Sequence, residues 1–314
     1  MTIPNWNGQR FLAPCLDALL RQTRLPDEII VVDSNSTDGS VELVQRRYPV
    51  VRLVQLGRRL GIAAAFNACL RSARGDGIVL LNNDTEPTPR WLELLEAACR
   101  TDPDIGACAS KILFIKDRQT INSAGDFYRR DGTPGNRGVW EIDRGQYDQS
   151  PYVFSAMAAA ALYTRAAIED VGLFDEGLVS YCEDIDWSFR AHLRGWRCRF
   201  VADAVVYHHG SATGGGSYAS YYCARNFVLV FVKNMPGKLF RRYLSLHVAR
   251  GLWLSLKTLP HVREPAARAW LRGQSAAVLA LPRYLHVRQE VQRRRLAAEE
   301  EIDQLLSGDW HFWR

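Results

Sequence analysis

The sequence is poor in lysine, contains no long apolar run and has no closely paired cysteines. Lysine accounts for only five of the 40 basic residues in the 314-residue chain. The longest apolar run, residues 152–163, falls short of the ~20 residues that a membrane span needs. The seven cysteines form no C-x-x-C pair and no set with metal-ligand spacing, so we expect free, buried thiols in a reducing compartment.

The overall composition is that of a folded, water-facing protein. The chain is 24% charged and 47% hydrophobic, which excludes a disordered chain, a collagen-like fibre and a disulfide miniprotein. Its length allows one large core with an appended helical piece. The net charge of +6 suits phosphates, anionic lipid or nucleic acid. Because Met1 leads directly into a short polar turn unlike a signal peptide, we expect a cytoplasmic protein, soluble or peripheral on the inner face of the plasma membrane.

The first two-thirds of the chain alternates short β-rich runs with amphipathic helical stretches. Strands are predicted at Glu28–Asp33, Val50–Gln55 and Gly77–Leu81, and helices at Val41–Arg47, Leu60–Ala73 and residues 89–100. Strands and helices that alternate at this spacing predict an α/β fold with a mostly parallel sheet covered by helices on both faces. Ligands of such sheets bind at the carboxyl ends of strands, where Asp33 and Asp84 lie.

The composition of the chain changes twice in its second half. Residues 120–151 are rich in Gly, Asp and Arg and are predicted to form loops or hairpins beside the site. A second α/β stretch follows, with a helix at Glu183–Leu193, short strands at Cys198–Val201 and Ala204–His208, and a mobile glycine loop at 210–217. Residues 238–259 and 266–295 are predicted helices, apolar on one side and Arg-rich on the other. We expect an α/β domain over residues 1–217 and a C-terminal helical region over 218–314.

Two acids follow predicted strands. Asp33 ends a buried strand before a Ser-Asn-Ser-Thr turn, where its carboxylate can accept hydrogen bonds from a nucleobase or ribose. The alternative is an acid that only caps the turn. Asp84 follows Asn82 and Asn83 and can bind a divalent cation, since Mg²⁺ and Mn²⁺ favour a few carboxylates with phosphates and water. Here the alternative is an Asx-turn.

Three further acidic residues lie close together at the start of one predicted helix. Glu183, Asp184 and Asp186 lie in the first turn, beside Trp187. A solvated first turn is one interpretation, because acids are favoured at a helix N-terminus. The aromatic neighbour instead favours a pocket in which one carboxylate acts as a general base. Asp186 and Arg190, four residues apart, are spaced to pair along the helix.

A histidine pair ends the last predicted strand of the α/β region. His208 and His209 immediately precede the glycine loop. A neutral imidazole at this place can complete a metal site begun by Asp84. The alternative is a hydrogen-bonded structural role.

The order of these motifs resembles family 2 glycosyltransferases with the GT-A fold, in particular bacterial rhamnosyltransferase-like members that build surface polysaccharides and the cell wall. The resemblance covers about residues 1–235. It rests on six motifs in order, namely the P-N-W-N-G turn at 4–8, the nucleoside segment at 26–40, G-x-x-x-A-x-N at 61–67, L-N-N-D at 81–84, the acceptor-side motif at 172–186 and Y-H-H-G-S at 207–211.

The resemblance implies an inverting, metal-dependent glycosyltransferase that moves a sugar, with rhamnose as the first choice, from a dTDP- or UDP-sugar to a glycan or lipid-linked acceptor. Asp184 would take the proton from the acceptor hydroxyl, and Glu183 would orient it or touch the sugar. Asp84 and His208 would bind Mg²⁺ or Mn²⁺ on the diphosphate. The donor-binding residues implied are Pro4, Asn5, Asn7, Asp33, Asn67 and Asn83.

The sequence departs from the family pattern in three places. Only three residues precede Pro4, so we expect a shortened first strand. Ser34 replaces the usual Asn or Asp, and Asn82 stands where many members have the first acid of D-x-D, so metal binding relies on Asp84 and the histidine. Two other functions remain open. One is a non-catalytic nucleotide-sugar-binding scaffold, and the other is a nucleotidyltransferase, although residues 5–8 do not look like a phosphate loop.

The C-terminal third interleaves arginines with Leu, Trp and Tyr. Basic amphipathic helices that carry Trp253 and Trp270 suit an anionic membrane surface, where a lipid-linked acceptor would lie. The alternative is ordinary packing on the α/β domain or on a second subunit of an oligomer. Nucleic acid is not an expected partner, because the sequence contains no recognised module for it.

Overall fold

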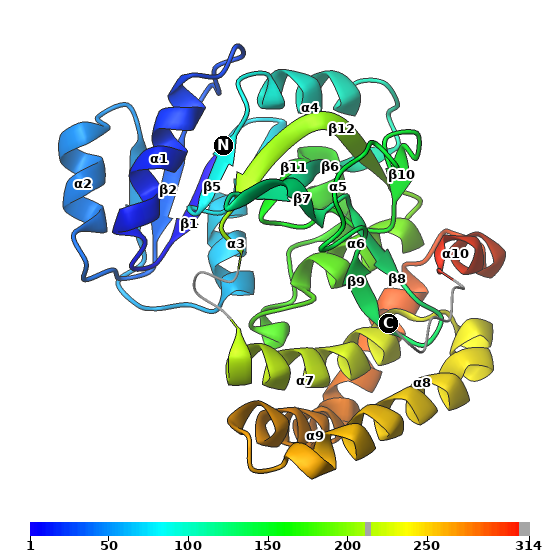
Figure 1. Cartoon of the computed structure of the whole chain (residues 1–314). Helices are drawn as coiled ribbons and strands as arrows, with labels where there is room; N and C mark the ends of the chain where they lie inside the picture. The colour runs from blue at the N-terminus through cyan, green and yellow to red at the C-terminus, as the bar shows by residue number, and fades with distance from the viewer. Residues whose placement is uncertain (211–214, 308–314) are drawn as a thin grey trace.

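A single large sheet runs through the computed structural model, which describes residues 1–210 and 215–307 (Figure 1). The strand order is β10-β12-β6-β11-β4-β1-β2-β3, with β5 added on β12 and β7 on β6. The strands are β1 (Thr2–Asn5), β2 (Ile30–Asp33), β3 (Arg52–Gln55), β4 (Gly77–Leu81), β5 (Thr85–Pro87), β6 (Ile105–Phe114), β7 (Asp117–Ser123), β10 (Tyr152–Val153), β11 (Ala160–Thr164) and β12 (Arg197–His208).

The sheet is mostly parallel, as the alternation of strands and helices predicted. β1 pairs in parallel with β2 and β4, β2 pairs in parallel with β3, and β6 with β12; β11 is antiparallel to both of its neighbours. The register sets Asn5 opposite Asp33, and Asp33 opposite Gln55. The carboxyl ends of β1 and β2 are therefore level, and both deliver polar side chains to one edge of the sheet.

Helices cover both faces of the sheet, because neighbouring residues of each central strand point in opposite directions. Ile30 and Val32 pack with Phe66, whereas Val31 packs with Leu12 and Leu16 on the other face. The helices of the α/β region are α1 (Gln9–Leu20), α2 (Ser40–Arg47), α3 (Ile62–Ser72), α4 (Trp91–Cys99), α5 (Arg165–Val171) and α6 (Glu183–Leu193), with the 3₁₀ turn η1 (Glu176–Leu178). Each of the seven cysteines, all within the described residues, is a free thiol.

Two details differ from the sequence prediction. Residues 197–208 form one long strand, β12, with a register shift between Val201 and Val205, and not two short strands. The exposed Asp203 lies between these two residues and interrupts the apolar pattern, so the sequence predicts two strands where the structure has one. The region predicted as loops or hairpins contains the hairpin of β8 (Asp126–Tyr128) and β9 (Pro134–Asn136). Residues 211–214 of the predicted glycine loop at 210–217 lie outside the described residues.

The C-terminal helices are α7 (Gly216–Asn234), α8 (Gly237–Thr258), η2 (Leu259–His261), α9 (Pro265–Arg293) and α10 (Glu299–Leu305). In the view of Figure 1, α7, α8 and α9 lie below the sheet, and α10 lies to the right. A shared apolar cluster joins Phe189 of α6 to Leu229 and Phe231 of α7 and Tyr284 of α9. None of the helices within the described residues is both long and apolar enough to cross a membrane. The domain division predicted after residue 217 falls inside the first turn of α7 and stays a prediction.

A buried carboxylate ties α6 to α7. Asp186 has no exposed surface, and its oxygens accept from Lys233 Nζ at 2.9 Å, Asn234 Nδ2 at 2.8 Å and Arg190 Nε at 3.0 Å. The predicted pair of Asp186 and Arg190 is thus present. Burial by itself would raise the pKa of Asp186, but the charges of Lys233 and Arg190 and the bond from Asn234 together lower it. A buried ion deprived of its partner is strongly destabilising, so this cluster fixes the position of the α6 N-terminus.

Candidate active site

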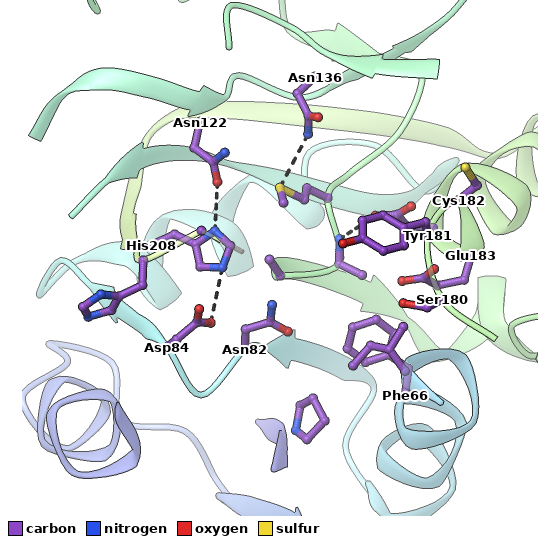
Figure 2. Close-up of a pocket in the computed structure, with 18 of the residues that line it drawn as sticks. Phe66, Asn82, Asp84, Asn122, Asn136, Ser180, Tyr181, Cys182, Glu183 and His208 are labelled. Atoms are coloured by element: carbon purple, nitrogen blue, oxygen red, sulfur yellow. Dashed lines mark hydrogen bonds and ion pairs between the residues drawn. The ribbon is translucent and has the colours of Figure 1, made fainter. Parts of the chain in front are cut away.

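One open cavity of about 1450 Å³ lies at the carboxyl ends of the central strands. Its lining comes from segments far apart in the chain, including the end of β1, the turn after β4, the end of β12 and the start of α6. Figure 2 shows Asp84 and His208 on one side of the cavity and Glu183, Ser180 and Tyr181 on the other. This is the edge at which ligands bind in open α/β sheets.

Four side chains from three strand ends form a hydrogen-bonded chain in the floor of the cavity. Asn83 Nδ2 donates to Asn5 Oδ1 at 2.7 Å, and Asn5 Nδ2 donates to Asp33 Oδ1 at 2.8 Å. Ser36 donates its hydroxyl to Asp33 Oδ1 at 2.6 Å and its backbone N–H to Asp33 Oδ2 at 2.9 Å. Pro4, Asn5 and Asn83 line the cavity, whereas Asp33 is buried behind them with both oxygens engaged.

The other two predicted donor-binding residues do not line the cavity. Asn7 is exposed, and its side-chain oxygen accepts from the backbone N–H of Thr37 at 2.8 Å. Asn67 is fully buried; its amide donates to the carbonyl of Phe174 at 3.0 Å and to Glu176 at 2.9 Å, and accepts from Phe174 N at 2.9 Å. These bonds fasten α3 to the segment before η1, so Asn67 positions the wall of the cavity and does not face into it.

The predicted metal ligands meet although they are 124 positions apart in the sequence. His208 Nε2 lies 3.3 Å from Asp84 Oδ1, and both side chains are buried. His208 Nδ1 lies 2.8 Å from the amide oxygen of Asn122 on β7, as Figure 2 shows. Its neighbour His209 packs on Phe11 with ring centroids 4.7 Å apart, and its backbone N–H donates to the carbonyl of Asp84 at 3.1 Å.

The contact with Asn122 determines what His208 can bind. Because the Asn122 oxygen only accepts, Nδ1 must carry the proton, and the lone pair of a neutral ring is then on Nε2, facing Asp84. Two acceptors that face each other at 3.3 Å suit a cation between them, with the amide fixing the ring as outer partners of metal-bound histidines do. Among the described residues, no three or more His, Cys, Asp or Glu side chains gather as a metal cluster. A cation here would need phosphate oxygens and water to complete its coordination.

Two carboxylates at the start of α6 form the opposite side of the cavity. Asp184 accepts from the backbone N–H groups of Ala158 at 3.1 Å and Ile185 at 2.8 Å. Burial raises the pKa of Asp184, and these two bonds offset the rise in part. Burial and the charge of Asp184 raise the pKa of Glu183 to about 8, and its Oε2 has no hydrogen-bond partner among the described residues. The first turn of α6 is therefore largely buried, and the interpretation of its acids as a solvated helix start is wrong.

A strained segment leads into α6 and is held by the C-terminal helices. Three non-glycine residues, Val179, Tyr181 and Cys182, have φ between 64° and 66°, which is a rare conformation for bulky side chains. Asn226 of α7 is fully buried, and its amide nitrogen lies 2.8 to 2.9 Å from three carbonyl oxygens of residues 178–181. The position of Glu183 and Asp184 thus depends on a residue more than 40 positions further along the chain.

Several residues of the cavity could not be predicted from the sequence. Asp126 of β8 is buried, lines the cavity and accepts from Ser123 Oγ at 2.8 Å and Asn136 Nδ2 at 2.9 Å. Burial and the charge of Asp184 raise the pKa of Asp126 well above its ordinary value. Asn122 and Asp126 lie in the predicted loop region, whose weak periodicity offers no signal that would single them out. Only their contacts with His208 and Asp184 identify them.

Glu183 should make stability depend on pH in a defined direction. Because its pKa is raised from 4.5 to about 8, the folded protein keeps a proton that the unfolded chain releases. The free energy of unfolding should therefore fall as the pH rises through this window, by about 1.4 kcal/mol per pH unit at most. Glu183→Gln should remove the Glu183 contribution and make the fall in the free energy of unfolding shallower, as measured by urea unfolding at about pH 5 and about pH 9.

The matched control is Glu290→Gln, because the Glu290 side chain is 59% exposed. The control should keep the pH dependence of the wild type. A Glu183→Gln protein whose stability falls with pH as steeply as that of the wild type would contradict the assigned shift.

Comparison with known sequences identifies related proteins. A family model described as glycosyl transferase family 2 matches residues 2–172. The N-acetylglucosaminyl-diphospho-decaprenol L-rhamnosyltransferase of Mycobacterium tuberculosis is 30% identical over 245 residues, which are 71% of this chain and 78% of that protein. The O-antigen biosynthesis protein RfbC of Myxococcus xanthus is 29% identical over 224 residues, 67% of this chain and 17% of its own length.

Comparison with solved structures concerns the fold alone, because the identities are low. S. aureus TarS 1-349 in complex with UDP-GlcNAc aligns with a TM-score of 0.60 and 17% identity, covering 97% of this chain and 91% of that one. The mannosyltransferase PcManGT of Pyrobaculum calidifontis, in complex with GDP-Man and Mn²⁺, aligns with a TM-score of 0.54 and 19% identity, covering 93% and 84%. The match extends through the C-terminal helices. The chain is a glycosyltransferase of family 2 with the GT-A fold, and among its relatives it is similar to rhamnosyltransferases.

Proposed function

We propose that the protein transfers a sugar from a nucleotide diphosphate to a hydroxyl of a glycan or lipid-linked acceptor, with inversion at the anomeric carbon. The observation that carries this proposal is that one cavity has the Asp84–His208 pair on one side and Asp184 on the other. The similarity to an enzyme named as a rhamnosyltransferase supports rhamnose as the sugar, and hence a dTDP- or UDP-sugar as donor. The same name, which includes a diphospho-decaprenol, supports a lipid-linked acceptor in surface polysaccharide synthesis.

Asp184 is the proposed base. In a single displacement, the acceptor oxygen forms a bond to the anomeric carbon, the bond from that carbon to the diphosphate breaks, and the hydroxyl proton passes to Asp184. Its two backbone N–H bonds hold the carboxylate in place, and its raised pKa brings it closer to neutral pH, which favours proton transfer. Glu183, with an oxygen that has no partner among the described residues, is proposed to orient the acceptor hydroxyl or the sugar.

Asp84 and His208 are the residues that would hold Mg²⁺ or Mn²⁺. The ion would neutralise charge that develops on the departing diphosphate. The chain's own part is to present a carboxylate and an imidazole Nε2 in a buried position, with Asn122 fixing the tautomer. Asn5 and Asn83 line the floor and are proposed to contact the nucleotide, while Asp33 holds them in place from behind.

Helix α8 is proposed to rest on an anionic membrane. Leu244, Val248, Leu252 and Leu256, spaced four apart, form an apolar stripe with exposures of up to 63%. The described helix α8 contains basic residues but no Asp or Glu. A second copy would bring the same positive charge against it, so charge complementarity favours anionic lipid as the occupant. A protein at that surface would meet a lipid-linked acceptor directly.

Replacement of the proposed base should separate chemistry from binding. Asp184→Asn keeps the shape of the side chain but cannot take a proton, so transfer should fall about 10²–10⁴-fold. Nucleotide affinity, measured by calorimetry, should stay within about twofold. The control is Asp203→Asn, an exposed carboxylate on β12. Near-normal turnover by Asp184→Asn would show that Asp184 is not the base. If the wild type binds nucleotide sugars but turns none of them over, the result would favour a non-catalytic scaffold.

The metal site can be tested through the residue behind it. EDTA should abolish transfer, and Mn²⁺ should restore it. Asn122→Ala should raise the Mn²⁺ concentration needed for half-maximal activity about 10–100-fold, because His208 loses the partner that fixes its ring. Gln119→Ala, at an exposed position of the same strand, should leave this concentration unchanged. Full activity in chelator would remove Asp84 and His208 from the proposed role.

Membrane contact can be tested by sedimentation with lipid vesicles. The wild type should bind vesicles that contain phosphatidylglycerol, bind phosphatidylcholine vesicles weakly, and dissociate as salt is added. A Leu252→Glu and Leu256→Glu double variant should bind at least about tenfold less, since burying one leucine contributes roughly 1.5–3 kcal/mol. The control is Val50→Glu, 70% exposed and remote in sequence. If the wild type forms dimers and binds no vesicles, and the double variant is monomeric, the apolar stripe is a contact with a second copy of the chain.

A further inference from the structure

An aromatic pair, the exposed Trp140 and the half-buried Phe114, forms part of the cavity wall and has no role in the chemistry described above. The Trp140 side chain is 73% exposed and stacks on Phe114, with ring centroids 4.4 Å apart and an interplanar angle of 13°. Both residues line the cavity that holds the carboxylates. A large apolar ring left open to water in the wall of a cavity suits a ligand that would cover it.

The ring is held in place by a rigid loop. Lys111 on β6 is 5% exposed and binds Asp143 at 3.0 Å and Asp148 at 2.6 Å, which ties residues 143–148 to the sheet. The backbone N–H of Trp140 donates to the carbonyl of Ile121 on β7 at 2.9 Å. The indole is therefore fixed at the cavity by bonds on both sides of it in the loop.

The backbone at Trp140 is in a conformation that costs stability. Its φ is 69°, in the left-handed region, which is uncommon for any bulky side chain. Glycine would adopt this conformation without strain. Strain of this kind is found at ligand clamps and active sites, where the surrounding structure maintains it.

The aromatic pair adjoins the Asp84–His208 side of the cavity, across from Asp184, so a sugar stacked there is one that does not carry the attacking hydroxyl of the acceptor. Phe114 is the register partner of His208, and the next backbone N–H, that of Ile115, donates to the carbonyl of His208 at 2.9 Å. The cavity volume of about 1450 Å³ exceeds the ~300–1,000 Å³ of a typical single-ligand pocket. There is thus room for a second molecule beside the donor.

The chemistry of the pair suits a sugar ring. One face of a pyranose presents several C–H groups, which are weakly positive, and the face of an aromatic ring is negative. Lys116, Asp117 and Thr120 line the same part of the cavity and can bond the hydroxyl groups at the ring edge. Apolar contact on the face with polar contact at the edge is the combination that a pyranose requires.

We propose that Phe114 and Trp140 form an acceptor subsite, in which a pyranose ring of the acceptor stacks on the indole of Trp140. This rests on the proposed function, because it assigns the acceptor of that reaction to a defined wall of the cavity. The subsite accepts sugars of the acceptor glycan and takes no part in holding the nucleotide.

Saturation-transfer NMR with methyl pyranosides tests the subsite. The protein, with UDP or dTDP and Mg²⁺, is titrated with the methyl glycosides of glucose, galactose, mannose, rhamnose and N-acetylglucosamine. Transfer to the ring protons of one face is expected for at least one glycoside. Trp140→Gly should raise its dissociation constant about tenfold, and Trp140→Phe, which keeps an aromatic face, only about two- to threefold.

Two controls separate binding from folding. Trp140→Gly should melt at the same or a higher temperature than the wild type, because glycine removes the strain at φ 69°. Ile142→Ala removes an exposed side chain of the same loop that does not line the cavity, and should bind the glycoside as the wild type does.

The outcomes distinguish this inference from the proposed function. Equal glycoside affinity in the wild type and Trp140→Gly would overturn the subsite, as would nucleotide binding with no glycoside bound. An equal loss of nucleotide affinity in Trp140→Gly would assign the ring to the donor and also overturn it. If the wild type binds neither UDP nor dTDP, the proposed function itself fails.

Discussion

The structure depends on neutralising one carboxylate that is cut off from water. Asp186 is stable in the core only because Lys233, Asn234 and Arg190 surround it, and two of these belong to α7. The same helix supplies Asn226, which holds the strained segment before α6. Since Glu183 and Asp184 begin α6, the C-terminal helices and the proposed base belong to one packed unit, and the helical region is more than an attachment to the sheet.

The two sides of the cavity differ in their electrostatics. Around Asp184, burial raises the pKa values of three carboxyl groups, those of Asp126, Glu183 and Asp184 itself, and the charge of Asp184 adds to the rise at Asp126 and Glu183. Around Asp84, the partner is instead an imidazole oriented by an amide. The groups proposed to take a proton and those proposed to hold a cation are thereby kept apart, as the proposed inverting displacement between a base and a leaving diphosphate requires.

Much of the fold could be predicted from the periodicity of apolar residues, and the errors of that prediction have local causes. Glu183–Leu193 was predicted with the bounds that α6 has, because its apolar residues recur at helical spacing. β12 was predicted as two strands because the exposed Asp203 interrupts its apolar alternation, although the backbone pairing continues across a register shift. Asp33 and Asn67 were predicted to touch the donor; both make hydrogen bonds within the protein, and their contact with the donor stays a prediction. Short-range patterns report burial and do not say which neighbour satisfies a polar group.

By itself the sequence determined the α/β class, the parallel sheet and the acids at strand ends, because each of these follows from spacing within a few residues. Tertiary structure alone decided which polar groups meet. His208 faces Asp84 because β5 and β12 are adjacent, and Asn122 and Asp126 reach the site because β7 and β8 lie beside it. The two partners of His208 lie 86 and 124 residues away from it along the chain, and local sequence carries no record of such pairings.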